Sequence, residues 1–378
     1  MTLIAGATLV TPEGTVDSGW LDVVDGRIAA LGAGPPPRAA DHTVTGWVVP
    51  GFVDIHSHGG GGATVVGAEP ESVRTFATTH RRHGTTTLMA SLVTGLPDEL
   101  EHDVRALAEL VDDGLIAGVH LEGPWISAER KGAHSAHKLA DPSPDVVDRL
   151  LKAGRGRIRM VTLAPERDHG LDAIRRIVDA GAIAAAGHTD ASYEVIGSAV
   201  DAGVTVATHL FNAMAPVHHR DPGPIVALLE DERVTCELIL DGIHLHPAIA
   251  ALAAGSAGRG RVALVTDAMA ATDVGDGDYV LGDREVRVTD GVARLIDGGS
   301  IAGSTLTMDA AFRYAVRQVG LSVEDAAYAA ATKPAQLLGL GDRTGALIEG
   351  YDADLVLLDE DLTVQAVMSH GTWLHTTP

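Results

Sequence analysis

A series of eight short apolar runs, separated by amphipathic stretches, constrains the fold of this chain more than any other feature. The runs occupy residues 52–56, 85–91, 115–121, 158–164, 182–187, 204–209, 235–240 and 261–266. Segments between them, such as 69–83 and 170–181, carry apolar residues at the spacing of a helix. Strands that alternate with helices in this way form parallel sheets. The sequence therefore predicts an α/β fold, a (β/α)8 barrel of the TIM type.

The two ends of the chain have a different pattern. Residues 1–49 alternate apolar and polar side chains, and residues 353–375 repeat that style, which predicts hairpins. We expect the two ends to pair into one composite β-sandwich. The predicted domains are residues 1–49 plus 340–378 for the small β-sandwich and residues 50–339 for the barrel. Between Met269 and Ser304, the stretch DYVLGDREVRVTDGVARLIDG predicts a β-hairpin insertion.

Charge and composition exclude several classes of partner. The 378 residues carry a formal net charge of −23, which argues against binding to nucleic acid or to an anionic membrane. No apolar run reaches the roughly 18 residues of a membrane span, and the first residues lack the basic region of a signal peptide. The single cysteine, Cys236, excludes an internal disulfide. These features predict a cytoplasmic protein.

Polar residues that can bind a metal follow five of the apolar runs or stand at their ends. His56 and His58 close the first run, and residues i and i+2 of a strand point to the same side. Each such residue alone is explained as a solvated strand end or a helix N-cap. In a barrel, however, all the strands end at one rim, where the chemistry occurs. Imidazole and carboxylate ligands without thiolate suit zinc, iron(II), cobalt or manganese. The sequence therefore predicts a metal site from His56, His58, Glu122, His188, His209 and Asp267.

Other histidines have simpler explanations. The basic run TTHRRHG (78–84) predicts a solvated helix face that includes His80 and His83. His218 and His219 are expected in an exposed loop. His246 precedes a proline and is expected to begin a helix.

These motifs resemble the amidohydrolase superfamily, in which a histidine pair follows the first strand and an aspartate follows the eighth. A glutamate after the third strand, in place of a lysine after the fourth, narrows the resemblance to the N-acetylglucosamine-6-phosphate deacetylase family. The blocks that carry it are HLEGPWIS and KGAH (within 120–134), GHTDASYE (187–194), THLFNAM (208–214), LILDGIHLHP (238–247), LVTDAMAATDVGDG (264–277), GSIAGSTLTMD (299–309) and GALIEGYDADLVLLD (345–359). The resemblance covers nearly the whole chain. It implies hydrolysis of N-acetylglucosamine 6-phosphate to glucosamine 6-phosphate and acetate, in amino-sugar catabolism and cell-wall recycling.

The resemblance also implies roles for the metal-binding residues. Glu122, His188 and His209 match the principal ligands of that family. Members that keep the first histidine pair hold a second ion, so His56 and His58 imply capacity for two divalent metals, with Glu122 bridging them. Zinc is the first expectation, with iron, cobalt or manganese as alternatives. Asp267 matches the catalytic acid/base.

Further positions match the substrate site of the family. Such a hydrolase must stabilise charge on the carbonyl oxygen, and His134 could do so. Arg220 is expected to clamp the phosphate, because arginine can bind phosphate through two hydrogen bonds. In this family a neighbouring subunit can complete the phosphate site, and homodimers or homotetramers are usual. The matching positions are Ala133, His134, Asn212, Ala213, Arg220, Asp241, Gly242, Ile243, His244, Ala302, Gly303 and Ser304.

Two alternative functions stay open at this point. One is hydrolysis of a cyclic amide on the same scaffold, but such relatives usually carry a lysine after the fourth strand, which here ends Leu163-Ala164-Pro165-Glu166. The other is a metal-bearing protein without turnover. Loss of the aspartate after the eighth strand would mark such a protein, and Asp267 is present.

Overall fold

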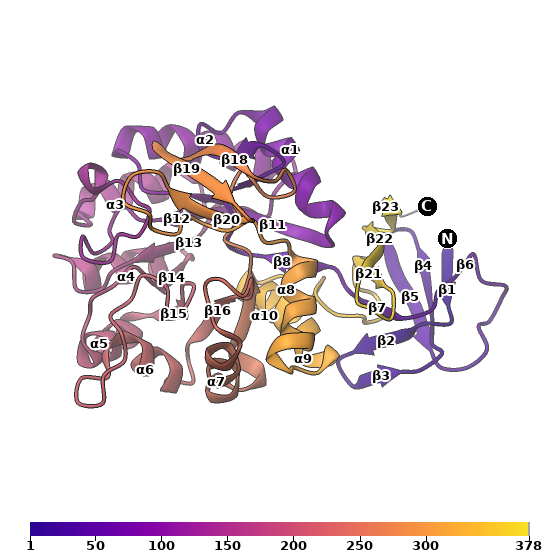
Figure 1. Cartoon of the computed structure of the whole chain (residues 1–378). Helices are drawn as coiled ribbons and strands as arrows, with labels where there is room; N and C mark the ends of the chain where they lie inside the picture. The colour runs from indigo at the N-terminus through magenta and orange to yellow at the C-terminus, as the bar shows by residue number, and fades with distance from the viewer. Residues whose placement is uncertain (377–378) are drawn as a thin grey trace. The chain divides into compact units, whose positions relative to one another are not determined.

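The computed structural model describes residues 1–376, and each of the eight predicted runs overlaps one strand of a single eight-stranded sheet (Figure 1). The strands lie in the order β17-β16-β15-β14-β13-β12-β11-β8. From β11 to β17, consecutive strands pair in parallel. Their bounds are β8 Phe52–Asp54, β11 Thr85–Leu92, β12 Gly118–Glu122, β13 Ile158–Leu163, β14 Ile183–Ala186, β15 Val204–Ala207, β16 Thr235–Ile239 and β17 Val262–Val265.

Backbone hydrogen bonds just beyond the first and last strands bring the sheet close to a closed barrel. The Asp267 N–H donates to the His56 carbonyl at 2.9 Å, and the His58 N–H donates to the Ala268 carbonyl at 2.8 Å. These bonds join the segment after β8 to the segment after β17. The predicted (β/α)8 fold is confirmed, and the carboxyl ends of its first and last strands meet at one point.

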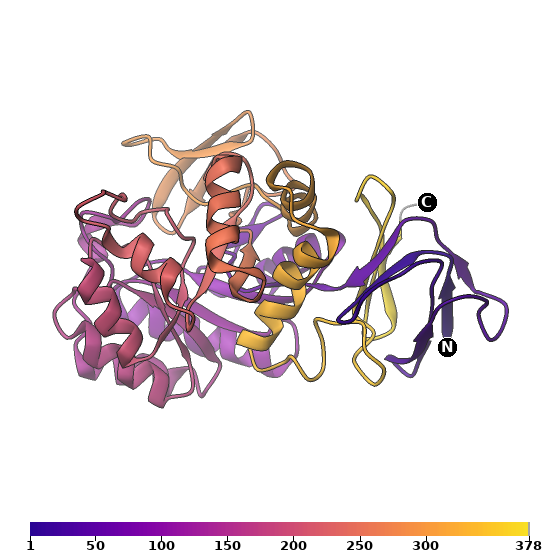
Figure 2. The same ribbon diagram turned by 90° about the horizontal axis from the view of Figure 1, so that it is seen from below.

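Helices follow the strands and contact one another in chain order, α2 to α3 and onward to α7 (Figure 2). Their bounds are α1 Pro70–Arg82, α2 Pro97–Asp112, η1 Ala136–Lys138, α3 Pro144–Ala153, α4 Gly170–Asp179, α5 Tyr193–Ala202, α6 Gly223–Glu230, α7 Pro247–Ala257 and η2 Arg259–Arg261. In α4, Ala173, Ile174 and Ile177 are buried, which is the stripe that a helix turns toward a sheet. His246 caps α7 by accepting the Ala248 N–H, as predicted. Within residues 1–376, no helix is both long and apolar enough to cross a membrane.

The end of α1 corrects one prediction. His80 is completely buried, although the basic run around it predicted a solvated face. Val73, Phe76 and Ala77 of the same helix are buried as well. His80 continues this row at the i+7 position, so helical periodicity outweighs the polarity of its neighbours.

Strands from both ends of the chain build two further sheets, as predicted. One has the order β5-β4-β1-β6, and the other, β23-β22-β21-β7-β2-β3, mixes N- and C-terminal strands. Both sheets contribute side chains to one apolar cluster, which includes Ile4, Leu21, Leu355 and Met368. The bounds are β1 Thr2–Ala5, β2 Thr8–Thr11, β3 Gly14–Val16, β4 Trp20–Val24, β5 Arg27–Gly32, β6 His42–Thr43, β7 Trp47–Pro50, β21 Leu355–Leu358, β22 Val364–Ser369 and β23 Thr372–Thr376.

The chain separates into two compact units. One consists of residues 1–54, 78–87 and 307–378, and the other of residues 55–77 and 88–306. The first contains the two terminal sheets and the last helices, α8 Met308–Tyr314, η3 Ala315–Val319, α9 Val323–Ala327, η4 Tyr328–Thr332 and α10 Lys333–Leu337. The domain boundaries drawn from the sequence, at 49/50 and 339/340, stay a prediction.

The predicted insertion forms its own antiparallel sheet, drawn in orange in Figures 1 and 2. It has three strands, one more than a hairpin: β18 Gly277–Leu281, β19 Arg284–Thr289 and β20 Val292–Leu295. Leu281, Val286 and Leu295 pack in one cluster with Val93 and Met269. A second short pair, β9 Gly59–Gly60 and β10 Ala63–Thr64, follows the histidine pair.

Candidate metal-dependent active site

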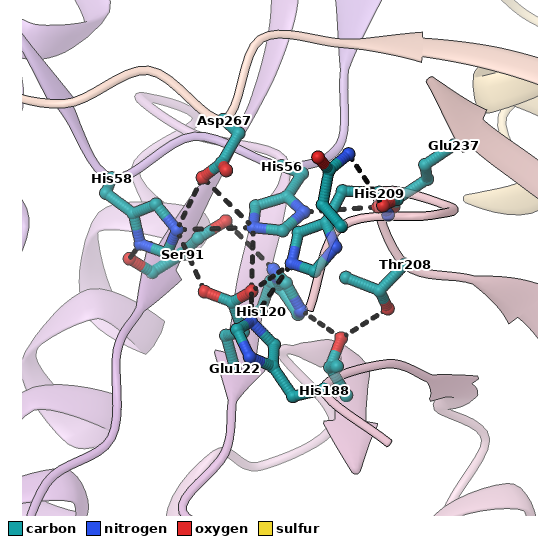
Figure 3. Close-up of polar contacts among 12 residues, drawn as sticks. His56, His58, Ser91, His120, Glu122, His188, Thr208, His209, Glu237 and Asp267 are labelled. Atoms are coloured by element: carbon teal, nitrogen blue, oxygen red, sulfur yellow. Dashed lines mark hydrogen bonds and ion pairs between the residues drawn. The ribbon is translucent and has the colours of Figure 1, made fainter. Parts of the chain in front are cut away.

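Three of the predicted site residues share one unusual backbone position. His188, His209 and Asp267 each lie two residues beyond the end of a barrel strand, β14, β15 and β17 respectively. Their φ angles are 49°, 31° and 50°, in the left-handed region that residues other than glycine rarely adopt. Such strain costs on the order of 1–3 kcal/mol per residue and is concentrated at functional sites. Figure 3 shows His188 and His209 beside Glu122, with Asp267 on the other side of the histidine pair.

Glu122, the last residue of β12, lies at the centre of the cluster, and its two carboxylate oxygens have different neighbours. Oε1 is 2.9 Å from His209 Nε2 and 3.1 Å from His188 Nε2. Oε2 is 3.1 Å from His58 Nε2 and 3.4 Å from His134 Nε2. Oε1 is also 3.6 Å from His56 Nε2. The carboxylate therefore contacts two groups of imidazoles, His188 with His209 and His56 with His58, as a shared ligand must.

The histidine pair and Asp267 form the second group. His56 Nε2 and His58 Nε2 are 3.2 Å apart, and Asp267 Oδ1 is 3.2 Å from His58 Nε2 and 3.6 Å from His56 Nε2. All three side chains are almost completely buried. Figure 3 shows Asp267 reaching the pair from the opposite side to Glu122.

The hydrogen bonds on the far side of each ring test whether these residues suit a metal. His58 Nδ1 lies 2.8 Å from the Ser91 carbonyl, and His188 Nδ1 lies 2.8 Å from the Arg130 carbonyl. A carbonyl can only accept, so in the neutral rings the proton is on Nδ1 and Nε2 presents a lone pair. In that neutral state the lone pairs face carboxylate oxygens at about hydrogen-bond distance with no proton between them. A cation resolves this repulsion, and the donor set of nitrogen and oxygen fits zinc and its neighbours.

The remaining two rings are compatible with the same arrangement. His56 Nδ1 is 3.1 Å from Glu237 Oε2, so it holds its proton there and Nε2 faces the cluster. His209 Nδ1 is buried without a hydrogen-bond partner among the described residues, and it can carry the proton that frees Nε2. All four Nε2 atoms are therefore available as ligands.

The protonation of the metal-free cluster shows how strongly these groups interact. Burial lowers the pKa of His58, but hydrogen bonds to Asp267 and Glu122 outweigh it and raise the pKa to about 9. Burial raises the pKa of Asp267, but the charges of His56 and His58 bring it below its usual value. Without a metal the histidine pair thus gains protons, which a metal ion must displace in order to bind.

Residues behind the ligands were missed by the sequence analysis. Glu237, on β16, is buried and accepts from both His56 Nδ1 and the His209 N–H, each at 3.1 Å. His120, on β12, bonds Ser91 Oγ at 2.9 Å and Thr162 Oγ1 at 2.8 Å. The signal that could have found Glu237 is a single carboxylate within the apolar run TCELIL, because a buried charge needs a partner.

His134 differs from the other histidines in its tautomer. Its Nδ1 accepts the Thr94 N–H at 3.3 Å, so the proton of the neutral ring is on Nε2. Burial lowers the pKa of His134 to about 4, and the ring is neutral at pH 7. His134 therefore presents a hydrogen-bond donor to the cluster rather than a lone pair.

A cavity of about 420 Å³ opens onto this cluster. Among the predicted site residues, those that line it are His58, Glu122, Ala133, His134, His188, His209, Asn212, Ala213, His244, Asp267 and Gly303. The predicted residues outside its lining are His56, Arg220, Asp241, Gly242, Ile243, Ala302 and Ser304. Its size suits a small polar ligand.

Several of the predicted residues outside the lining support it from behind. Asp241 Oδ2 bonds His244 Nδ1 at 2.7 Å. Burial lowers the pKa of His244, but this bond outweighs it, and the pKa of His244 lies above its ordinary value. Ser304 accepts a hydrogen bond at its carbonyl from the Met269 N–H and donates its own N–H to the Asp267 carbonyl. It thereby ties the strained Asp267 segment in place.

Comparisons with known proteins place this geometry in a family. Residues 47–374 match the amidohydrolase family. The chain belongs to the amidohydrolase family.

Individual relatives of this amidohydrolase are similar along almost their whole length. The N-acetylgalactosamine-6-phosphate deacetylase of Escherichia coli O157:H7 is 34% identical, with 96% of each chain covered. The N-acetylglucosamine-6-phosphate deacetylase of Bacillus subtilis is 33% identical, covering 98% of this chain and 96% of the relative. The solved structure of a Mycobacterium smegmatis N-acetyl-D-glucosamine-6-phosphate deacetylase mutant, in complex with N-acetyl-D-glucosamine-6-phosphate, has a TM-score of 0.97 at 48% identity and 99% coverage of each chain.

In this amidohydrolase, Arg220 is a predicted phosphate-binding residue that does not line the cavity of its own chain. It is exposed, and its Nη1 is 2.7 Å from the neighbouring His219 Nε2. His218 and His219 are exposed loop residues, as predicted. The phosphate-binding role of Arg220 therefore stays a prediction that depends on what this loop meets in an assembly.

The cavity of the amidohydrolase has a wall that the sequence analysis did not assign. The turn between β18 and β19 contributes Leu281, Gly282, Asp283 and Arg284 to the lining. The insertion was predicted as a hairpin, but nothing in its own pattern showed which way its turn would face.

Proposed function

We propose that this amidohydrolase removes the acetyl group from N-acetyl-D-glucosamine 6-phosphate, giving D-glucosamine 6-phosphate and acetate. It is a hydrolase of a linear amide C–N bond in amino-sugar catabolism, with a role in cell-wall recycling and a cytoplasmic location. The compared relatives are named for deacetylation of N-acetyl amino-sugar 6-phosphates. The observation that carries the proposal is one cavity in which a neutral donor, His134, and a carboxylate, Asp267, lie beside the converging ligand atoms of Glu122 and His188.

The proposed cofactor is one or two divalent metal ions, with zinc first and iron, cobalt or manganese as alternatives. Glu122, His188 and His209 would hold the principal ion. His56, His58 and Asp267, with Glu122 shared, would hold the second. When bound, such an ion polarises the acetamide carbonyl and lowers the pKa of the attacking water.

The residues of the chain supply the proton transfers. Asp267, a carboxylate at neutral pH, accepts a proton from water as the new C–O bond forms at the carbonyl carbon. It then donates that proton to the sugar nitrogen as the C–N bond breaks, because an amide anion is too basic to leave. His134 donates its Nε2 hydrogen to the carbonyl oxygen, where negative charge develops.

The phosphate is assigned to cationic side chains. His244 lines the cavity and is kept protonated to higher pH by Asp241. Arg220 is assigned to the cavity of a neighbouring subunit in a homodimer or homotetramer. Ala133, Asn212, Ala213 and Gly303 line the cavity and complete the proposed sugar contacts, with no role for nucleic acid or membrane. Gly242, Ile243 and Ala302 lie outside the lining, and their contact with substrate stays a prediction.

The test is acetate release by the purified protein in the presence of added zinc. N-Acetylglucosamine 6-phosphate should be hydrolysed, and the unphosphorylated sugar should be poorer by about tenfold or more in kcat/KM. No acetate from the phosphorylated sugar would refute the proposal. Equal rates on both sugars would refute phosphate recognition alone.

The galactosamine epimer is a second candidate substrate, because one relative is named for it at 34% identity. N-Acetylgalactosamine 6-phosphate belongs in the same assay, and the ratio of the two kcat/KM values decides which epimer this site prefers.

A further inference from the structure

The turn between β18 and β19, together with the strand residue on either side of it (281–284), forms one wall of the active-site cavity, and Arg284 is among the lining residues. The turn belongs to the inserted sheet that is orange in Figure 2. None of its residues is among the ligand-binding positions assigned above.

This turn is fixed in place. The apolar side of the inserted sheet is buried against Met269 and Ala302. Asp283 accepts a hydrogen bond from Ser135 Oγ and lies 3.6 Å from Lys138 Nζ. Ser135 follows His134 directly, so the turn is tied to the loop that carries a proposed catalytic group. The wall is therefore pre-organised for a ligand.

Arg284 follows Asp283 in the chain, and its guanidinium group makes only weak contacts within the protein. Its Nη2 is 3.9 Å from Asp297 Oδ2 and 3.4 Å from the Asp297 carbonyl, and the Asp297 side chain is fully exposed. An exposed pair at that distance contributes little. Arg130, another arginine of the lining, is already bound by Asp190 at 2.7 Å. The Arg284 side chain is only 23% exposed, so the wall holds its guanidinium close to the protein surface.

The charge of the site requires such a group. Glu122, Glu129, Asp267 and Asp283 line the cavity, and the whole chain carries −23. A phosphorylated sugar is repelled by that field unless cations offset it locally. A guanidinium group can hold a phosphate through two parallel hydrogen bonds.

We propose that Arg284 is a specificity-determining residue, which binds the phosphate of the substrate from the β18–β19 wall. The inference rests on the proposed function, since it assumes a phosphorylated amino sugar in this cavity. Arg284 would then be a third cationic side chain at the phosphate, beside His244 and Arg220, and it would come from the same chain as the cavity.

The experiment compares Arg284→Gln with Arg287→Gln. Arg287 lies on the same strand and is held by Asp278 at 2.7 and 2.9 Å, outside the cavity lining. Arg284→Gln should lower kcat/KM for N-acetylglucosamine 6-phosphate by about ten- to a hundredfold and leave the unphosphorylated sugar nearly unchanged. Arg287→Gln should change neither. Arg284→Lys should give an intermediate loss, because lysine keeps the charge without the two-pronged geometry.

The outcomes separate the inference from the function on which it rests. A wild-type protein that releases no acetate refutes the proposed function itself. An active wild type with Arg284→Gln equal to Arg287→Gln refutes the role of Arg284 alone. Equal losses on both sugars by a folded Arg284→Gln protein also refute it, because phosphate recognition would then not be the property that was lost.

Discussion

At the residue scale, the chemistry depends on lone pairs directed at Glu122. Replacing Glu122 with Gln removes the charge that two groups of imidazoles share. We expect the variant to lose the principal metal and to lose acetate release together. Metal analysis of the dialysed protein checks this, with Glu129→Gln as the control, because Glu129 lines the cavity but bonds Ser127. Full metal content and a full rate in Glu122→Gln would refute the ligand assignment.

Asp267 should show the signature of a proton-transfer group. Its carboxylate lies 3.2 Å from His58 Nε2 and keeps a pKa below its usual value. Asp267→Asn should lower kcat by about a hundredfold or more and change KM far less. Steady-state kinetics on the metal-loaded variant make the measurement. If kcat falls only slightly, another group carries out the proton transfers, and His134 is the next candidate for that role.

The pair of Asp241 and His244 predicts a pH dependence. The pKa of His244 is raised, so the imidazolium that binds phosphate persists above pH 6.5 and is lost as pH rises through the raised pKa. In Asp241→Asn the hydrogen bond and the charge of Asp241 are lost, while burial still lowers the pKa and the charge of Asp267 still raises it, so the pKa of His244 falls. KM for the phosphorylated sugar should therefore begin to rise at lower pH in the variant. The ionisation of the substrate phosphate is the same in assays of both proteins and cannot cause a difference between them. If KM depends on pH in the same way in both proteins, His244 does not have this role.

Strand-end residues could be predicted from the sequence because parallel strands bring their carboxyl ends together. Glu122, His188, His209 and Asp267 were predicted in this way, and the structure brings them into one cluster with the histidine pair. Glu237 was missed because its strand is otherwise apolar, and its importance depends on a histidine 181 positions away. Arg284 was missed because the direction of a turn is set by tertiary packing.

At the element scale, the close approach of β14 and β15 requires a residue without a side chain. A Cβ on Gly187 would lie 2.7 Å from Thr208 Cβ and 2.9 Å from Thr162 Cγ2. Gly187→Ala must therefore shift the segment that carries His188, and we expect a loss of about 1–3 kcal/mol in unfolding free energy, with weaker metal retention.

Gly197→Ala is the matched control for that variant. Gly197 is inside α5, and no heavy atom of the described residues, its own helix backbone apart, lies within 4 Å of its ideal Cβ. Alanine there should leave stability unchanged or raise it by up to about 1 kcal/mol. Thermal denaturation of both variants makes the comparison, and equal melting temperatures would contradict the packing argument.

The elements themselves were largely predictable, because each barrel strand is a short apolar run bounded by polar segments. The insertion has three strands rather than two. Two Gly-containing turns separate its strands, whose sequences include DYVL, REVRVT and VARL. A hairpin has only one such turn, so the predicted hairpin was one strand short. The prediction that His80 lies on a solvated face of α1 was wrong. It followed the polarity of the neighbouring residues, whereas the helical spacing from Val73 and Phe76 indicates the buried face.

At the scale of the whole molecule, one acidic chain must concentrate positive charge where an anionic substrate binds. Metal ions at the cluster, His244 and Arg284 would supply it from within one chain. Arg220 is exposed in a loop, and the phosphate-binding role proposed for it assumes a neighbouring subunit. The assembly is therefore part of the proposed specificity and not of the proposed bond cleavage.

Restoring metal to the stripped protein tests the central claim most directly. The protein is freed of metal with a chelator, dialysed, and titrated with zinc while acetate release from N-acetylglucosamine 6-phosphate is measured. The converging Nε2 atoms predict negligible activity at the start and a rise that reaches its plateau within one or two equivalents per chain. Full activity in the stripped protein, with no detectable metal bound, would contradict the account.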